Sequence, residues 1–137
     1  MATTVRRVDY FYVLVPDRPG EAARHLAALQ REGIDLLAFS GFPEGRGGQL
    51  DFVPVDPRAF RALARREKWR LVGPKRAFLI SGDDRPGALA RVLGKLAEAA
   101  INVVAVDAAT AGRGRFGAIL WVRPEDTRAA GRILGAR

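Results

Sequence analysis

The sequence predicts an α+β fold of two similar units in tandem, each with the element order βαββαβ. The first observation is a repeated tetrapeptide, Asp-Arg-Pro-Gly, at residues 17–20 and 84–87. Each copy, here called a corner, lies between an apolar run and a helix-like run. The second observation is that the offset of 67 residues (84 − 17) keeps further identities in register without a gap. The third is a hydrophobic content of 48%, which is enough to bury a core.

The identities at this offset extend through helices, strands and loops. Chance does not hold register through loops, so the chain is interpreted as a tandem duplication with domains at residues 1–72 and 73–137. The matching pairs include Arg24 with Arg91, Leu29 with Leu96, Ile34 with Ile101, Val55 with Val122, and Pro57 with Pro124.

Strands are predicted where β-branched and aromatic residues cluster, and helices where apolar residues recur at helical spacing. In each copy a first helix follows the corner, and a second begins at Pro57 or Pro124. The glycine-rich segments 44–49 and 111–117 are predicted hairpin turns. This is the ferredoxin-like order, with antiparallel sheets and helices on one face. The predicted strands are Val8–Val15, Asp35–Ser40, Leu50–Val55, Trp69–Val72, Arg76–Ser81, Asn102–Ala108 and Ala118–Val122.

The second copy lacks its last strand, because only residues 135–137 follow its final helix. Two alternatives remain open. Trp69–Val72 stays with the first copy, or it turns at Gly73-Pro74 and pairs with Arg76–Ser81, in which case Ala2–Val5 serves the first copy. Both predict one intramolecular pair of similar sheets.

The strand at residues 10–15 and those at 35–39 and 118–122 are apolar on both faces. A half-exposed antiparallel sheet would alternate apolar and polar residues. Helices cover only one face, so we expect the other to be buried against a second sheet, within the chain, in a homodimer, or both.

Several function classes are disfavoured by composition. The chain has no cysteine, so it has no disulfide frame and no thiolate nucleophile. No apolar run approaches the roughly 20 residues that span a bilayer, and the N-terminus has no signal-peptide pattern. We expect a cytoplasmic protein without a membrane partner.

Catalytic constellations are also missing. His25, the only histidine, is expected at or near the surface and not as a base. No metal cluster of His, Cys and carboxylates is apparent. Gly112, Gly114 and Gly117 match a dinucleotide fingerprint but lead into a strand, so this segment is read as a hairpin turn. We expect no enzymatic activity, no metal and no cofactor.

A net charge of +8 makes nucleic acid the rival partner class. Arginines share one face of the helix that begins at Pro57, and such a patch could neutralise phosphates. No aromatic residue is interleaved for base stacking, so nucleic-acid binding is the less favoured alternative. The residues of this patch are Arg58, Arg61 and Arg65, followed by Arg66, Lys68 and Arg70.

The corner suits a small anionic ligand. Its Asp is a good helix N-cap, its Pro fits a first turn, and its Gly lets a neighbour approach the backbone. Free N–H groups at a helix N-terminus favour a carboxylate. The alternative is that each corner is only a helix start.

Together these motifs resemble the ACT-domain family. Its units carry a D/N-R-P-G corner, and a G-[IV]-N-[IV] segment at the start of strand two, seen here as "GIDL" (33–36) and "AINV" (100–103). The resemblance covers nearly the whole chain as two copies.

The resemblance implies a regulatory protein that binds an amino acid or similar metabolite where two units meet. It acts through an enzyme or a transcriptional regulator. In serine-binding members, the corner residue and the Asn of strand two hold the amino acid. Here three of those four positions are acids, which suit an ammonium but argue against serine. The implied ligand residues are Asp84, Arg85, Pro86, Gly87, Asn102 and Val103, with Asp17, Arg18, Gly20 and Asp35 in the first copy.

Overall fold

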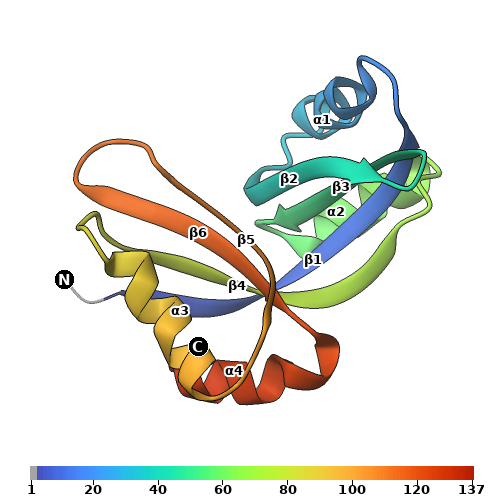
Figure 1. Ribbon diagram of the computed structural model, residues 1–137. Helices are drawn as coiled ribbons and strands as arrows, with labels where there is room; N and C mark the ends of the chain where they lie inside the picture. The colour runs from blue at the N-terminus through green and yellow to red at the C-terminus, as the bar shows by residue number, and fades with distance from the viewer. Residues whose placement is uncertain (1–2) are drawn as a thin grey trace. The chain divides into compact units, whose positions relative to one another are not determined.

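A computed structural model describes residues 3–137 (Figure 1). The fold is α+β and ferredoxin-like, with antiparallel strand pairing, as the sequence predicts. None of the helices in this range is long and apolar enough to cross a bilayer. The elements are β1 (Thr4–Pro16), α1 (Glu21–Arg31), β2 (Leu36–Glu44), β3 (Gly47–Pro54), α2 (Pro57–Arg66), β4 (Val72–Asp83), α3 (Ala88–Glu98), β5 (Val103–Thr110), β6 (Arg115–Val122), a 3-10 turn η1 (Pro124–Asp126) and α4 (Thr127–Leu134).

The chain forms two compact units, one of residues Asp9–Lys75 and one that joins the residues up to Val8 with Arg76–Arg137. We call them the first and the second unit. The hydrogen-bonded order of the strands is β2-β3-β1-β4-β6-β5. The long strands β1 and β4 are both divided between the units. The first unit therefore has the order β2-β3-β1-β4, and the second has the order β5-β6-β4-β1.

This division differs from the expected boundary between residues 72 and 73. The start of β1 belongs to the second unit, where Val5 packs against Phe78 and Ile80. The tail continues this arrangement: the Arg137 N–H donates to the Val5 carbonyl at 3.0 Å, and the Arg7 N–H donates to the Arg137 carbonyl at 2.8 Å. The strand that the second copy lacks is therefore supplied by the N-terminus (Figure 1).

Both open alternatives for the missing strand need correction. Residues 69–71 are not a strand, and Gly73-Pro74 lies inside β4 instead of forming a turn. Trp69 packs on the core of the first unit. Val5 serves the second unit and not the first, while Ala2 lies outside the described residues. The apolar pattern of the sequence identifies strand-forming segments, but it does not show which sheet edge each strand pairs with.

Glycines allow β1 and β4 to approach closely. A Cβ at Gly73 would lie 2.8 Å from the carbonyl oxygen of Tyr10, and one at Gly82 would lie 2.8 Å from Oγ1 of Thr3. Gly73 lies in the first unit and Gly82 in the second, so the pairing of β1 with β4 requires a glycine in each unit.

The core of the first unit is aromatic. The rings of Phe11 and Phe52 lie 5.4 Å and 5.2 Å from the ring of Phe60, and all three are fully buried. His25 is also buried, with its ring 4.6 Å from that of Trp69, so the expectation of a surface histidine is wrong. It shares the inner face of α1 with Ala28 and Leu29, and its Nδ1 lies 2.8 Å from the carbonyl oxygen of Glu21.

The second unit has a core in which aliphatic side chains predominate. The strands contribute Phe78, Ile80 and Leu120, and the helices contribute Leu96 and Ala130, all fully buried. Each core therefore lies between one sheet face and two helices.

The starts of the second helices agree in part with the prediction. α2 begins at Pro57, and the Asp56 carboxylate accepts the N–H groups of Arg58 and Ala59 at 3.1 and 3.2 Å. Pro124 instead opens the 3-10 turn, and α4 begins at Thr127.

We expect Val5→Asp to destabilise the protein by about 3 kcal/mol or more, because the new carboxylate would be left without a partner in the core of the second unit. Arg6→Ser is the control: Arg6 is the exposed neighbour on the same strand, and its replacement should change stability by less than about 0.5 kcal/mol. Urea denaturation measures both. Equal stabilities for Val5→Asp and the wild type would show that the N-terminal strand does not close this core.

Candidate functional site

Both corners lead into a helix through a glycine with a left-handed backbone. Gly20 (φ 91°) is the N-cap of α1, and Gly87 (φ 84°) is the N-cap of α3. No side chain caps either helix, so the expectation that the corner Asp caps it is wrong. A Cβ at either glycine would meet nothing within 4 Å. The glycine is therefore required by the positive φ.

The second corner borders a hollow of about 320 Å³. The Asp84 N–H donates to the Gly114 carbonyl at 2.8 Å, which ties the corner to the hairpin between β5 and β6. The Ala88 N–H donates to the Arg85 carbonyl at 3.0 Å. The next first-turn N–H groups have no partner inside the helix. The lining residues are Asp84, Arg85, Gly87, Ala88, Leu89, Ala90, Ala108, Ala109, Thr110 and Phe116.

This hollow brings together the two charges that a zwitterion needs. The exposed Asp84 offers a carboxylate to an ammonium, and the first turn of α3 offers N–H groups to a carboxylate. Arg85 and Gly87 line it as well, and Pro86 is exposed in the same corner.

Asn102 and Val103 lie at the opposite end of the second unit. Asn102 precedes β5, whose first residue Val103 pairs with Val122. The hollow at the corner lies beside Thr110, the last residue of β5. Seven residues (110 − 103) at roughly 3.3 Å each separate the two ends by about 23 Å. One unit therefore does not bring Asn102 and Asp84 together.

The first unit has the same polarity. Asp35 lies just before β2, where its carboxylate accepts the Leu36 N–H at 2.8 Å and its carbonyl accepts the Val55 N–H at 3.0 Å. Asp17 and the rest of the first corner lie beyond the other end, where Pro16 pairs with Gly47. Asp35 stabilises the start of a strand and does not approach the corner of its own unit.

Glu21, which directly follows the first corner, was not singled out by the sequence analysis. The Glu21 carboxylate accepts hydrogen bonds from Arg18 Nε and from Arg24, both at 2.7 Å, and its side chain is buried. The hydrogen bond from Arg24, then that from Arg18, lowers the pKa of Glu21. At the repeat offset Glu21 falls on Ala88, and this difference between the copies was the available signal.

The arginines of the alternative hypothesis, nucleic-acid binding, are exposed on α2. Arg58, Arg61 and Arg65 are all exposed, while Arg66 forms an ion pair with Glu32 at 2.8 Å. They belong to the first unit, whereas the residues that line the hollow at the second corner belong to the second.

Acid should weaken the first corner. A pKa below the usual glutamate value of 4.5 means that Glu21 contributes stability above that pH, and the contribution is lost as the pH falls through the lowered value. Thermal melts of the wild type and Glu21→Gln across this range measure the difference. The wild type should lose more stability than Glu21→Gln on acidification, and equal losses would contradict the pairing.

Comparisons with known proteins identify a matching domain family and similar folds. The family model of the ACT domain matches residues 77–136. A comparison with curated protein sequences gives no match. Three solved structures share the fold over nearly all of the chain. The protein BT0572 from Bacteroides thetaiotaomicron has a TM-score of 0.78 at 19% identity, covering 97% of this chain and 88% of that one.

The other two are regulatory subunits of aspartate kinase. The subunit from Thermus thermophilus, in its ligand-free form, has a TM-score of 0.64 at 21% identity, covering 98% of this chain and 95% of that one. The subunit from Thermus flavus has a TM-score of 0.60 at 19% identity, with the same coverage. Residues 77–136 thus match the model of the ACT-domain family, and the chain as a whole has a fold shared with these regulatory subunits of aspartate kinase.

Proposed function

We propose that the chain is a tandem ACT protein, without catalysis of its own, that binds an amino acid or similar small metabolite and regulates amino-acid metabolism through a partner. The observation that carries this proposal is the hollow at the second corner, which is lined by Asp84 and by the first turn of α3, a helix without a side-chain cap. The first unit supports the tandem reading, because its corner leads into α1 through a glycine of similar φ.

The ligand lies in the hollow as a zwitterion. Its ammonium pairs with Asp84, and its carboxylate accepts the N–H groups of Leu89 and Ala90 in the first turn of α3. The side chain of the ligand faces Phe116 and the end of β5, where the small side chains of Ala108 and Ala109 leave room. The apolar lining favours a small, uncharged side chain.

Another unit completes this site. Asn102, Val103 and Asp35 lie at the far end of their own units, so they reach a corner only where the end of another unit meets it. This supports a ligand position at ACT–ACT interfaces.

A homodimer supplies such interfaces. Large apolar side chains on the strands remain exposed, among them Leu14 at 64%, Val104 at 58% and Phe42 at 40%. Covering them removes apolar surface from water, which stabilises association. A dimer in light scattering supports this, and a monomer at all concentrations contradicts it.

The partner is an enzyme or a transcriptional regulator. The two subunits from Thermus are named as regulatory subunits of aspartate kinase, and they share this fold over 98% of the chain. These regulatory subunits are a precedent for a regulatory role in a chain of this architecture.

A thermal-shift screen against the twenty amino acids tests the proposal. A ligand at about one hundred times its Kd adds about 2.7 kcal/mol of stability. Asp84→Ala should weaken that ligand by about ten- to a hundredfold, because it removes a charged hydrogen bond. Gly87 is unsuitable for the test, since its φ of 84° strains most side chains whether or not a ligand binds.

Asp17→Ala is the matched control, because it removes the same carboxylate from the first corner, where Glu21 already occupies both arginines. It should leave the shift unchanged. A shift that survives Asp84→Ala undiminished would move the ligand away from the second corner.

The second candidate is a basic module that binds nucleic acid through α2. The exposed Arg58, Arg61 and Arg65 are the observation in its favour. Fluorescence anisotropy with a labelled single-stranded RNA distinguishes the two. Binding that persists at physiological salt and is lost in the triple Gln variant of these arginines would favour this candidate, and binding only at low salt would exclude it.

A further inference from the structure

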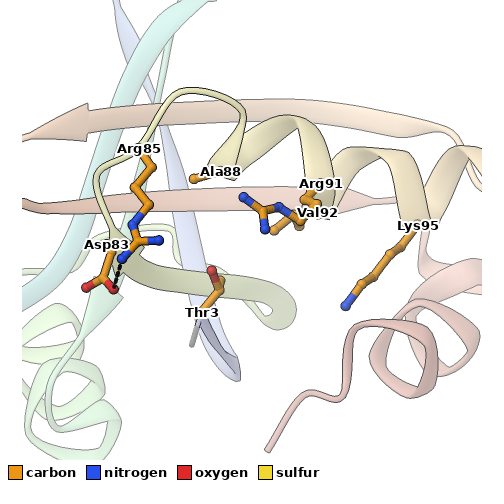
Figure 2. A pocket seen from close by; sticks show the side chains of 7 residues that line it. All are labelled: Thr3, Asp83, Arg85, Ala88, Arg91, Val92 and Lys95. Atoms are coloured by element: carbon orange, nitrogen blue, oxygen red, sulfur yellow. Dashed lines mark ion pairs between the residues drawn. The ribbon is translucent and has the colours of Figure 1, made fainter. Parts of the chain in front are cut away.

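The second unit has another hollow, of about 310 Å³, between α3 and the N-terminal strand (Figure 2). It carries three cations and one carboxylate. Figure 2 shows Arg85 and Arg91 pointing into the same space above Thr3, with Lys95 further along α3. The lining residues are Thr3, Asp83, Arg85, Ala88, Arg91, Val92 and Lys95.

The first unit shows what this arrangement of arginines holds. At the repeat offset, Arg85 and Arg91 correspond to Arg18 and Arg24. Those two arginines both donate to the Glu21 carboxylate at 2.7 Å. The first unit therefore contains a carboxylate, built into its own sequence, between the two cations.

The second unit has lost that carboxylate but kept both arginines. Ala88 stands at the position of Glu21. Arg85 lies 3.9 Å from Asp83, a long contact, and Asp83 also pairs with Arg115 at 3.0 Å. Within residues 3–137, Arg91 forms no ion pair. Like charges gathered on one hollow repel each other, so an anion there would be stabilised.

A third cation distinguishes this hollow from the corresponding position in the first unit. Lys95 lies one turn beyond Arg91 on α3, and at the repeat offset its counterpart is the buried Ala28. The hydroxyl of Thr3 adds a hydrogen-bond donor from the N-terminal strand. The second hollow is therefore built for more negative charge than the single carboxylate of Glu21.

We propose that this hollow binds a small dicarboxylate. One carboxylate takes the position between Arg85 and Arg91 that Glu21 takes between Arg18 and Arg24, and the second lies toward Lys95 and Thr3. The cations would repel the ammonium of a free amino acid, so this ligand is distinct from the zwitterion proposed for the corner. The inference does not depend on that proposal, because Arg91 and Lys95 line only this hollow.

Isothermal titration with succinate, at constant ionic strength, tests the site. One succinate per chain is expected, and acetate should bind at least about tenfold more weakly because it lacks the second carboxylate. Arg91→Gln and Lys95→Gln should each weaken succinate about tenfold or more, while Asp84→Ala should not. Inorganic phosphate binding as tightly as succinate would overturn the assignment to a dicarboxylate.

A reciprocal exchange between the units provides the matched pair of variants. Ala88→Glu places the carboxylate of the first unit into the second, so it should abolish succinate binding and raise the melting temperature without ligand. Glu21→Ala should open a second, weaker carboxylate site in the first unit. Succinate affinity that stays at the wild-type value in both Ala88→Glu and Arg91→Gln would overturn the proposal.

Discussion

The pairing of β1 with β4 is the constraint on which both units depend. Each of these strands is long enough to serve two units, and each unit takes one part of both. Val5 at one end lies in the core of the second unit, and Phe11 further along lies in the aromatic core of the first. The close approach needs glycine at positions 73 and 82, where a Cβ would meet the neighbouring strand. The two compact units therefore do not follow each other as consecutive halves of the chain.

The start of β1, which belongs to the second unit, is also covered along its outer edge. In the second unit the start of β1 lies beside β4, and the tail residue Arg137 forms backbone hydrogen bonds with β1 on its other side. An unpaired strand edge is a template for association with other chains. Apolar exposure is found instead on strand faces, at residues such as Leu14 and Val104. Faces of this kind favour association through side chains.

The two corners share a backbone conformation but differ in the side chains around them. Both use a glycine in a left-handed conformation to start a helix, and both present two arginines at the same spacing. The first unit neutralises its arginines internally through Glu21, which suits a structural role. The second has Ala88 there, and two hollows border its corner. The replacement of Glu21 by Ala88 thus leaves the second unit without the built-in carboxylate that pairs with both arginines of the first.

The sequence alone determined the features that arise from local pattern. The β-branched runs, the helical spacing and the corners predicted the α+β class and each of the six strands and four α-helices in residues 3–137. These signals could be read because the residues that carry them lie within a few positions of each other. Only the tertiary structure decided which strand closes the second unit, since that depends on which edge is left free. It also decided that His25 is buried and that Asn102 lies about 23 Å along the strand from the corner. The ion pairs of Glu21 were likewise decided by the tertiary structure. The residue is present in the sequence, but its pairing with Arg18 and Arg24 depends on how the corner folds back on the helix.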